Sequence, residues 1–280
     1  MHRAYVAVLF AAFAAAQGKL TVDRLAVHQH EDGPVLPLTY EFLPGETVHF
    51  SARLNGFAWE QDKESPDRYV RLTWQTSIAD AAGVAVDKPQ SGKIQATLTF
   101  QDKEWKPKML ANWTLPPHAS GGTYRVTLQA TDDVSHDVLT AVYDFKVRAP
   151  SMEPAAELAV RNLRFLRHED DTAALNPPAY RGGEALWAKF DIAGYKLGPS
   201  NRISVSYGLA VENAEGKQLF AQPDAALEQG EYFYPRRSVP GTLSLTLDAN
   251  VAAGEYVLVV LVDDKLGGTK RETRARFRVE

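Results

Sequence analysis

The sequence contains no cysteine. This absence excludes disulfide bonds, thiolate metal ligands, a cysteine nucleophile and the attachment of a lipid through a cysteine. The chain must therefore be stabilised by non-covalent packing alone. Helical patterns are also scarce, because beyond the first sixteen residues the apolar positions rarely follow a helical period. With 280 residues, the chain is long enough for two copies of roughly 130 residues that each bury a core.

The only long apolar segment lies at the N-terminus. His2 and Arg3 are followed by an uncharged stretch from Ala4 to Ala16, which ends in three alanines before Gln17. A basic start, an apolar centre and small residues at a cleavage point are typical of a secretory signal peptide. A membrane-spanning helix would need ~20 apolar residues. We therefore expect residues 1–16 to be removed and the mature chain to be a soluble protein, exported to the periplasm or to the extracellular space.

The charge balance is mildly acidic, with 31 Lys and Arg residues against 35 Asp and Glu residues and a formal net charge of −4. No basic stripe of the kind that binds nucleic acid or anionic lipid is present. We expect neither of these to be a partner.

Two parts of the sequence repeat one another. Residues 20–25, LTVDRL, lead to a His-Glu-Asp triplet, and residues 158–163, LAVRNL, lead to the same triplet at the same spacing. A duplication this regular indicates two copies of one folding unit. We assign the first domain to residues 18–148 and the second to residues 157–280, joined by residues 149–156, in which two prolines stiffen the connector.

Both copies continue with short alternating strands. A Gly-Glu pair, at Gly45 and again at Gly183, precedes a stretch in which every second residue is apolar, from 48 to 54 and from 186 to 192. Period-two alternation places those side chains on one face of a strand, and the glycine is typical of the turn before it. The pattern predicts an all-β protein of two tandem antiparallel β-sandwiches.

A second shared motif lies near the end of each copy. Gly122-Thr123-Tyr124 and Gly254-Glu255-Tyr256 each open a long alternating strand that ends at a pair of aspartates. Together with the Gly-Glu turns, these motifs resemble immunoglobulin-like modules of the fibronectin type III and macroglobulin-like kind, common in bacterial exported proteins. The resemblance implies that the Tyr124 and Tyr256 hydroxyls bond back to the preceding turn. It implies no ligand, because such modules share a scaffold and differ in their tasks.

The repeated triplets are candidates for a metal site. Imidazole and carboxylate groups bind divalent ions, and the first copy adds a histidine two residues before its triplet. The alternative is a solvated turn at a strand end, which we favour because adjacent ligands along one chain rarely converge on one ion. We expect no cofactor, and the weak metal candidates are His28, His30, Glu31, Asp32, His168, Glu169 and Asp170.

Features that occur in only one copy are free to serve a partner. The loop from Phe57 to Arg68 in the first copy is longer than its counterpart in the second, and it carries Trp59 among charged residues. Trp105 and Trp113 lie in a second stretch without a close counterpart. Exposed aromatic side chains of this kind contact protein partners or stack on sugar rings. Trp74, on the strand after the long loop, is expected in the core.

We interpret the chain as an exported, non-enzymatic protein that binds or scaffolds a partner, most simply another envelope or extracellular protein. The candidate contact residues are Trp59, Trp105 and Trp113. One alternative is a carbohydrate-binding protein that uses these tryptophans on a polysaccharide. A less favoured alternative is a metal-dependent hydrolase. Hydrolysis by a serine triad is disfavoured, because the sequence contains no Gly-x-Ser-x-Gly motif.

The aspartate pairs at the strand ends, Asp132-Asp133 and Asp263-Asp264, also resemble oxygen ligands for calcium. Neither pair lies in a dense acidic loop, and aspartates at such positions more often accept hydrogen bonds from the amides of the next turn. We expect added calcium to leave the melting temperature unchanged in thermal unfolding followed by circular dichroism. A saturable rise of several degrees would show that a calcium site exists.

Overall fold

The computed structural model describes residues 19–61, 64–149 and 155–280. The expected signal peptide, residues 1–16, and most of the connector therefore lie outside the described residues. The chain divides into two compact units, Met1–Ser151 and Met152–Glu280. Four sheets form two β-sandwich bodies, so the predicted all-β fold is confirmed.

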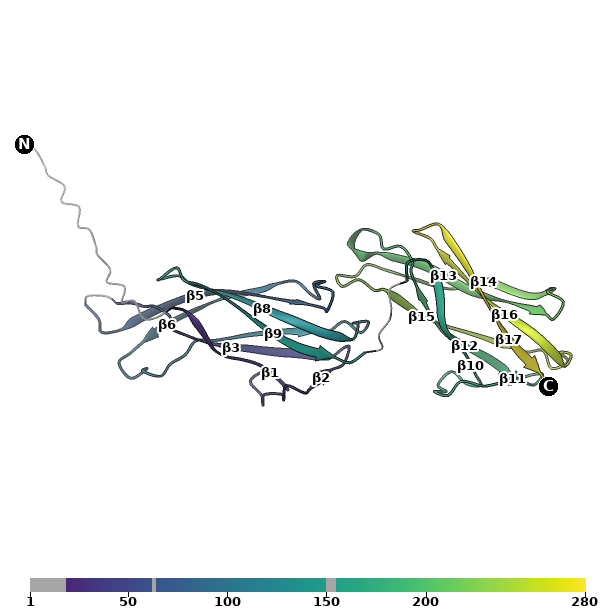
Figure 1. The fold of residues 1–280 in the computed structure, drawn as a ribbon, viewed down its shortest axis with the longest axis horizontal. Coiled ribbons are helices and arrows are strands. Elements are labelled where there is room, and N and C mark those ends of the chain that lie inside the picture. The colour runs from purple at the N-terminus through teal and green to yellow at the C-terminus, as the bar shows by residue number, and fades with distance from the viewer. Residues whose placement is uncertain (1–18, 62–63, 150–154) are drawn as a thin grey trace, which may run out of the picture. The chain divides into compact units, whose positions relative to one another are not determined.

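The first unit contains two sheets (Figure 1). One sheet has the strand order β1-β3-β7, and the other has the order β2-β9-β8-β5-β4, with β6 paired to the free side of β5. All pairings are antiparallel except that of β2 with β9. The strands of this unit are β1 (Thr21–His28), β2 (Glu41–Phe42), β3 (Thr47–Asn55), β4 (Glu60–Gln61), β5 (Arg68–Ala79), β6 (Gln90–Leu98), β7 (Lys108–Thr114), β8 (Gly122–Asp132) and β9 (Val138–Val147).

The second unit repeats this arrangement with sheets β10-β12-β15 and β11-β17-β16-β13-β14. It has no counterpart of the short strand β4 among its described strands. A single 3₁₀ turn, Pro199–Asn201, connects β12 to β13 instead. The strands are β10 (Ala159–Leu166), β11 (Ala179–Tyr180), β12 (Ala185–Ala193), β13 (Ile203–Asn213), β14 (Gln218–Gly230), β15 (Ser238–Thr246), β16 (Gly254–Asp264) and β17 (Thr269–Val279).

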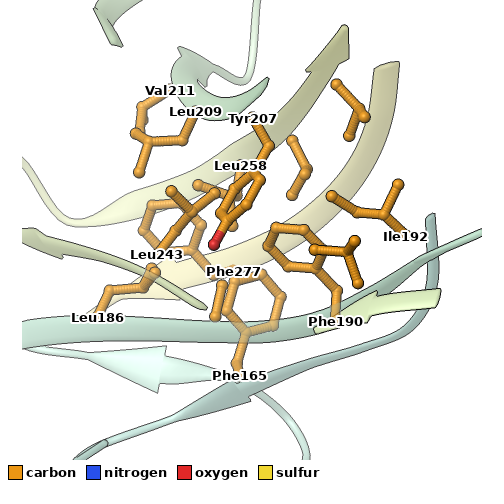
Figure 2. Close-up of a cluster of buried hydrophobic side chains, with 14 of the residues drawn as sticks. Phe165, Leu186, Phe190, Ile192, Tyr207, Leu209, Val211, Leu243, Leu258 and Phe277 are labelled. Carbon is orange, nitrogen blue, oxygen red and sulfur yellow. The ribbon is translucent and has the colours of Figure 1, made fainter. Parts of the chain in front are cut away.

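The core of each unit consists of the inward faces of its two sheets. Figure 2 shows the core of the second unit, where Leu186, Phe190 and Ile192 of β12 meet side chains of the opposite sheet such as Leu258 and Phe277. The apolar residues that alternate along β3 and β12 are all buried, as the period-two pattern predicts. Each fully buried large apolar side chain contributes about 1.5–3 kcal/mol, so this packing supplies the stability of a chain without covalent cross-links.

The hydroxyls of Tyr124 and Tyr256 bond back to the preceding turn, as predicted. The Tyr124 hydroxyl donates a hydrogen bond of 2.7 Å to the carbonyl of Ser120, and the Tyr256 hydroxyl donates one of 2.7 Å to the carbonyl of Ala252. Each bond ties the start of a long strand to the turn before it. The existence of these corners is therefore confirmed in both copies.

The turn glycines also have the expected role. Gly45 and Gly183 adopt φ values of 88° and 83°, a region that favours glycine because it lacks a Cβ atom. The glutamate after each glycine closes the turn, since Glu46 Oε2 accepts a bond of 2.7 Å from the amide of Leu43. Glu184 Oε2 accepts the equivalent bond of 2.9 Å from the amide of Arg181.

Trp74 departs from its predicted position. It is half-buried rather than in the core, because its ring lies against Gly92 of the edge strand β6. A Cβ atom at Gly92 would come within 2.6 Å of the indole, so the glycine makes room for the ring at the edge of the sandwich.

Candidate functional site

The long loop of the first unit is anchored by a buried carboxylate. Asp132, at the end of β8, is fully buried, and its Oδ2 atom accepts a bond of 2.6 Å from the amide of Ala58. Its Oδ1 atom accepts bonds of 2.9 and 3.3 Å from the amides of Val134 and Ser135. One side chain therefore fixes both the turn after β8 and the first residues of the loop that carries Trp59.

The second unit has the same anchor. Asp264 Oδ2 accepts a bond of 2.8 Å from the amide of Lys196, and its Oδ1 accepts bonds from the amides of Leu266 and Gly267. The prediction that aspartates at these strand ends bond to backbone amides is confirmed for both residues. The anchor is common to the two units, whereas the loop that follows it differs between them.

In the first unit this loop continues into β4, which pairs with the start of β5. Trp59, just before β4, is half-buried. The guanidinium carbon of Arg68 lies 5.3 Å from the centroid of the Trp59 ring, a cation–π arrangement. An Nη atom of Arg68 also donates a bond of 3.0 Å to the carbonyl of Thr99. Arg68 thus links the tryptophan loop to the turn after β6.

That turn is held by Asp102. Its Oδ2 atom accepts bonds of 2.8 Å from the Thr99 amide and 2.9 Å from the Thr99 hydroxyl. The bond from the Thr99 amide, followed by that from its hydroxyl, lowers the pKa of this carboxyl below its ordinary value. The carboxylate is therefore occupied by the turn that precedes Trp105.

Trp105 is also half-buried, and its ring packs edge-to-face against Phe57, with the ring centroids 5.6 Å apart at an angle of 88°. Trp59 and Trp105, from two separate loops, therefore line the same hollow of about 640 Å³ at one end of the first unit. We call this the tryptophan hollow. Its lining consists of Lys19, Thr21, Asn55, Gly56, Phe57, Trp59, Arg68, Leu98, Asp102, Lys103, Glu104, Trp105 and Lys106.

Trp113 does not belong to this hollow. Its side chain is 1% exposed and lies in the core, with its ring centroid 6.3 Å from that of Phe50. The prediction of an exposed contact residue at this position is wrong. The physical reason is the alternation of β7, which turns Met109, Ala111 and Trp113 inward together.

The metal candidates of the first copy do not converge on one ion, because His28 and Asp32 each bond to a different partner. His28 is buried, with Nδ1 2.8 Å from the Gly33 carbonyl and Nε2 2.7 Å from the Ser51 hydroxyl, so both ring nitrogens have partners. Asp32 forms an ion pair with Lys108, and its hydrogen bond lowers the pKa of the Asp32 carboxyl. His30 and Glu31 are exposed in the same turn.

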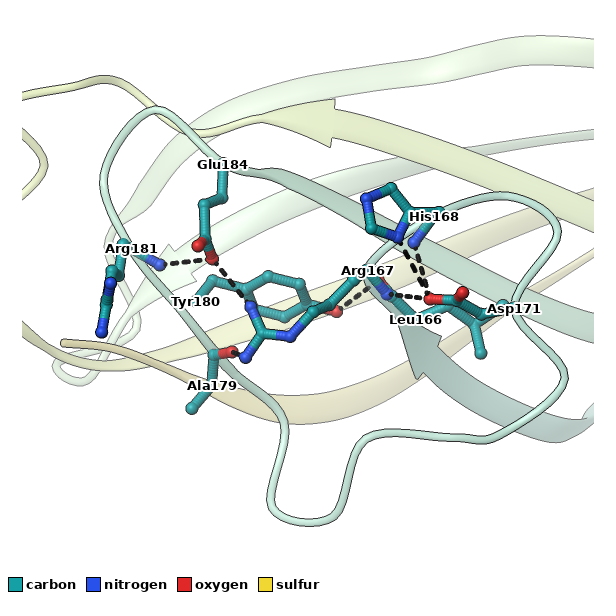
Figure 3. A network of polar contacts seen from close by, with 8 residues as sticks. All are labelled: Leu166, Arg167, His168, Asp171, Ala179, Tyr180, Arg181 and Glu184. Carbon is teal, nitrogen blue, oxygen red and sulfur yellow. Dashed lines mark hydrogen bonds and ion pairs between the residues drawn. The ribbon is translucent and has the colours of Figure 1, made fainter.

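The second-copy triplet is an exposed turn, and Figure 3 shows how it is held. The amide of His168 donates a bond of 2.9 Å to Asp171 Oδ2, while Glu169 and Asp170 are exposed. Next to this turn, the Tyr180 hydroxyl donates a bond of 2.9 Å to the carbonyl of Leu166, and burial raises the pKa of Tyr180 to about 12. Within the described ranges, no three histidine, aspartate or glutamate side chains gather as a metal site requires.

Sequence reasoning did not identify Arg68, Asp102 and the lysines of the hollow, because their loops meet only in the folded chain. The sequence carries a partial signal, since Trp59 and Trp105 both lie in stretches that the second copy does not reproduce closely. Among the described residues, no helix is long and apolar enough to cross a membrane.

No protein-family model matches the chain, and no curated protein matches it. Among solved structures it is similar to a red sea bream transglutaminase, at 13% identity over 94% of this chain and 31% of that chain, with a TM-score of 0.27. The chain thus spans about a third of the length of that protein.

It is also similar to the C-terminal domain of the Streptococcus pyogenes antigen I/II-family protein AspA, at 10% identity over 94% of this chain and 99% of that chain. The C-terminal domain of the Streptococcus agalactiae antigen I/II polypeptide BspA matches at 12% identity over 91% and 99%. Both TM-scores are 0.30. At such values none of these similarities bears on what the chain binds.

The role of Asp132 as an anchor of the long loop can be tested by mutation. We expect the change Asp132→Ala to lower the free energy of unfolding of the first unit by about 3 kcal/mol, because it removes three hydrogen bonds and leaves a buried amide unpaired. Urea unfolding followed by tryptophan fluorescence measures the loss. The change Asp87→Ala, at an exposed aspartate, is the control and should have little effect. Equal stability of the two variants would contradict the anchoring role of Asp132.

Proposed function

We propose that the chain is an exported, non-enzymatic binding or scaffolding protein that holds a protein partner at the tryptophan hollow. The observation that carries the proposal is that two half-exposed tryptophans from separate loops line one hollow. Tryptophan and arginine are the residues that most often dominate the energy of protein interfaces. Export rests on the signal peptide expected in residues 1–16, and the fibronectin type III or macroglobulin-like relationship stays a prediction.

Hydrogen bonds hold the loops around the tryptophan hollow in place, and this supports a binding role. Buried Asp132 fixes one loop, Asp102 fixes the turn before Trp105, and Arg68 connects the two. Side chains that are held in place before binding lose less conformational entropy when a partner arrives. Among the described residues that line the hollow there is no histidine, serine or cysteine, which favours binding over hydrolysis.

The charges of the hollow indicate the kind of partner surface. Lys19, Lys103, Lys106 and Arg68 outnumber the carboxylates Asp102 and Glu104. Asp102 is occupied by Thr99, and Lys106 forms an ion pair of 2.9 Å with Asp23. A partner surface that presents an apolar or aromatic group beside carboxylates complements this arrangement.

Carbohydrate binding by the three tryptophans is less well supported. Trp113 is buried, so it cannot contribute to a stacking platform. The guanidinium of Arg68 covers one face of Trp59, and Trp105 packs against Phe57.

We expect Trp59→Ala to weaken partner capture about tenfold or more, since truncation of a central interface tryptophan costs at least ~2 kcal/mol. Its effect on unfolding should be about 1 kcal/mol, the value of a partly exposed cation–π contact. Capture from the native envelope fraction, compared by quantitative mass spectrometry, measures the first effect, and urea unfolding measures the second.

The matched control is Phe233→Ala, which removes a half-exposed aromatic ring from the second unit and should leave capture unchanged. Equal capture by the two variants would contradict the proposal. A large loss of stability on changing Trp59 would instead assign that indole to the packing of the first unit.

A further inference from the structure

A second hollow, of about 560 Å³, lies on the outer face of the larger sheet in the first unit. It is distinct from the tryptophan hollow, because none of its lining residues is shared with it. We call it the tyrosine hollow. The residues that matter for its chemistry are Glu60 and Gln61 of β4, Tyr69 and Arg71 of β5, and Gln95 and Thr97 of β6.

The strand register places these side chains on one surface. Tyr69 is directly opposite Glu60 on one side and Thr97 on the other, and Arg71 is directly opposite Gln95. Residues that face each other across antiparallel strands project to the same side of the sheet. Val70, between Tyr69 and Arg71, is 1% exposed and points into the core. The tyrosine hollow therefore opens away from the core.

The floor and sides of this hollow combine an aromatic ring with fixed polar groups. Tyr69 is 37% exposed, so part of its ring is accessible to a ligand. An Nη atom of Arg71 bonds to Glu60 Oε1 at 2.7 Å, which orients the guanidinium and the carboxylate. Gln95 and Thr97 are exposed and contribute an amide and a hydroxyl.

The electrostatics of the hollow favour an uncharged ligand. Among the described residues that line it, only Glu60 and Arg71 are charged, and they neutralise each other. An anionic ligand would be repelled by the carboxylate of Glu60, and a cationic ligand would have to compete with Arg71 for that carboxylate. An uncharged ligand with many hydroxyl groups can accept from the guanidinium and the amide and donate to the carboxylate, and such charge-assisted bonds are the stronger kind.

The wall that closes the hollow occurs in one copy only. Glu60 and Gln61 belong to β4, and no described strand of the second unit corresponds to it. The shared sandwich does not need β4 for its packing, since the second unit forms its two sheets without it. Strand β4 therefore forms one side of the tyrosine hollow and is not part of the core that the two units share.

We propose that the tyrosine hollow is a binding site for a neutral saccharide. The apolar face of a sugar ring packs on Tyr69, and its hydroxyls bond to Gln95, Thr97 and the Glu60–Arg71 pair. This site is separate from the protein contact proposed at the tryptophan hollow, and either can exist without the other.

The test measures binding of the whole chain to a panel of neutral oligosaccharides, together with acidic oligosaccharides of similar size, by isothermal titration calorimetry. We expect at least one neutral oligosaccharide to bind and the acidic ones to bind more weakly. Tyr69→Ala should weaken that binding about tenfold or more, the loss expected for an aromatic anchor. Gln95→Ala should weaken it by a smaller factor.

Two variants serve as controls. Gln129→Ala removes an exposed glutamine of β8 that does not line the hollow, and Trp105→Ala alters only the tryptophan hollow. Both should bind saccharide as the unchanged chain does, and circular dichroism should show that Tyr69→Ala remains folded. Three outcomes would overturn the proposal: no binding across the panel, preference for acidic oligosaccharides, or loss of binding on changing Trp105 but not Tyr69.

Discussion

The burial of alternating apolar side chains between two sheets is the interaction on which every other feature of both units depends. The chain has no cysteine, so no covalent bond substitutes for this packing. Strand alternation places one face of each sheet inside, and the Tyr124 and Tyr256 corners fix where two of the long strands begin. The loops at the ends of the sandwich are then free to vary, provided that their first residues stay attached to the core.

The buried aspartates show how this attachment works. Asp132 and Asp264 hold equivalent loops by equivalent bonds, to Ala58 in one unit and Lys196 in the other. Beyond that point the first unit adds β4, which contributes to the tyrosine hollow and follows directly after Trp59. Residues shared by the two copies therefore maintain the fold, and the segment found only in the first copy contributes residues to both candidate binding surfaces.

Local patterns in the sequence predicted most of the fold. The alternation of β3 and β12, the turn glycines Gly45 and Gly183, and the tyrosine corners depend on residues that are close in sequence. The hollow that joins Trp59 to Trp105 was not predictable, because it forms where the loops after β3 and β6 meet in space. The burial of Trp113 was predictable in principle, because Met109 and Ala111 share its period-two alternation along β7.

The independence of the two cores can be tested most directly by expressing residues 19–148 alone. Because this segment contains both sheets of the first unit, β1 to β9, we expect the fragment to unfold cooperatively in urea and to give a well-dispersed NMR spectrum. Its unfolding transition should match that of the first unit in the whole chain. A fragment that stays unfolded while the whole chain folds would contradict the view that each copy is closed around its own apolar interior.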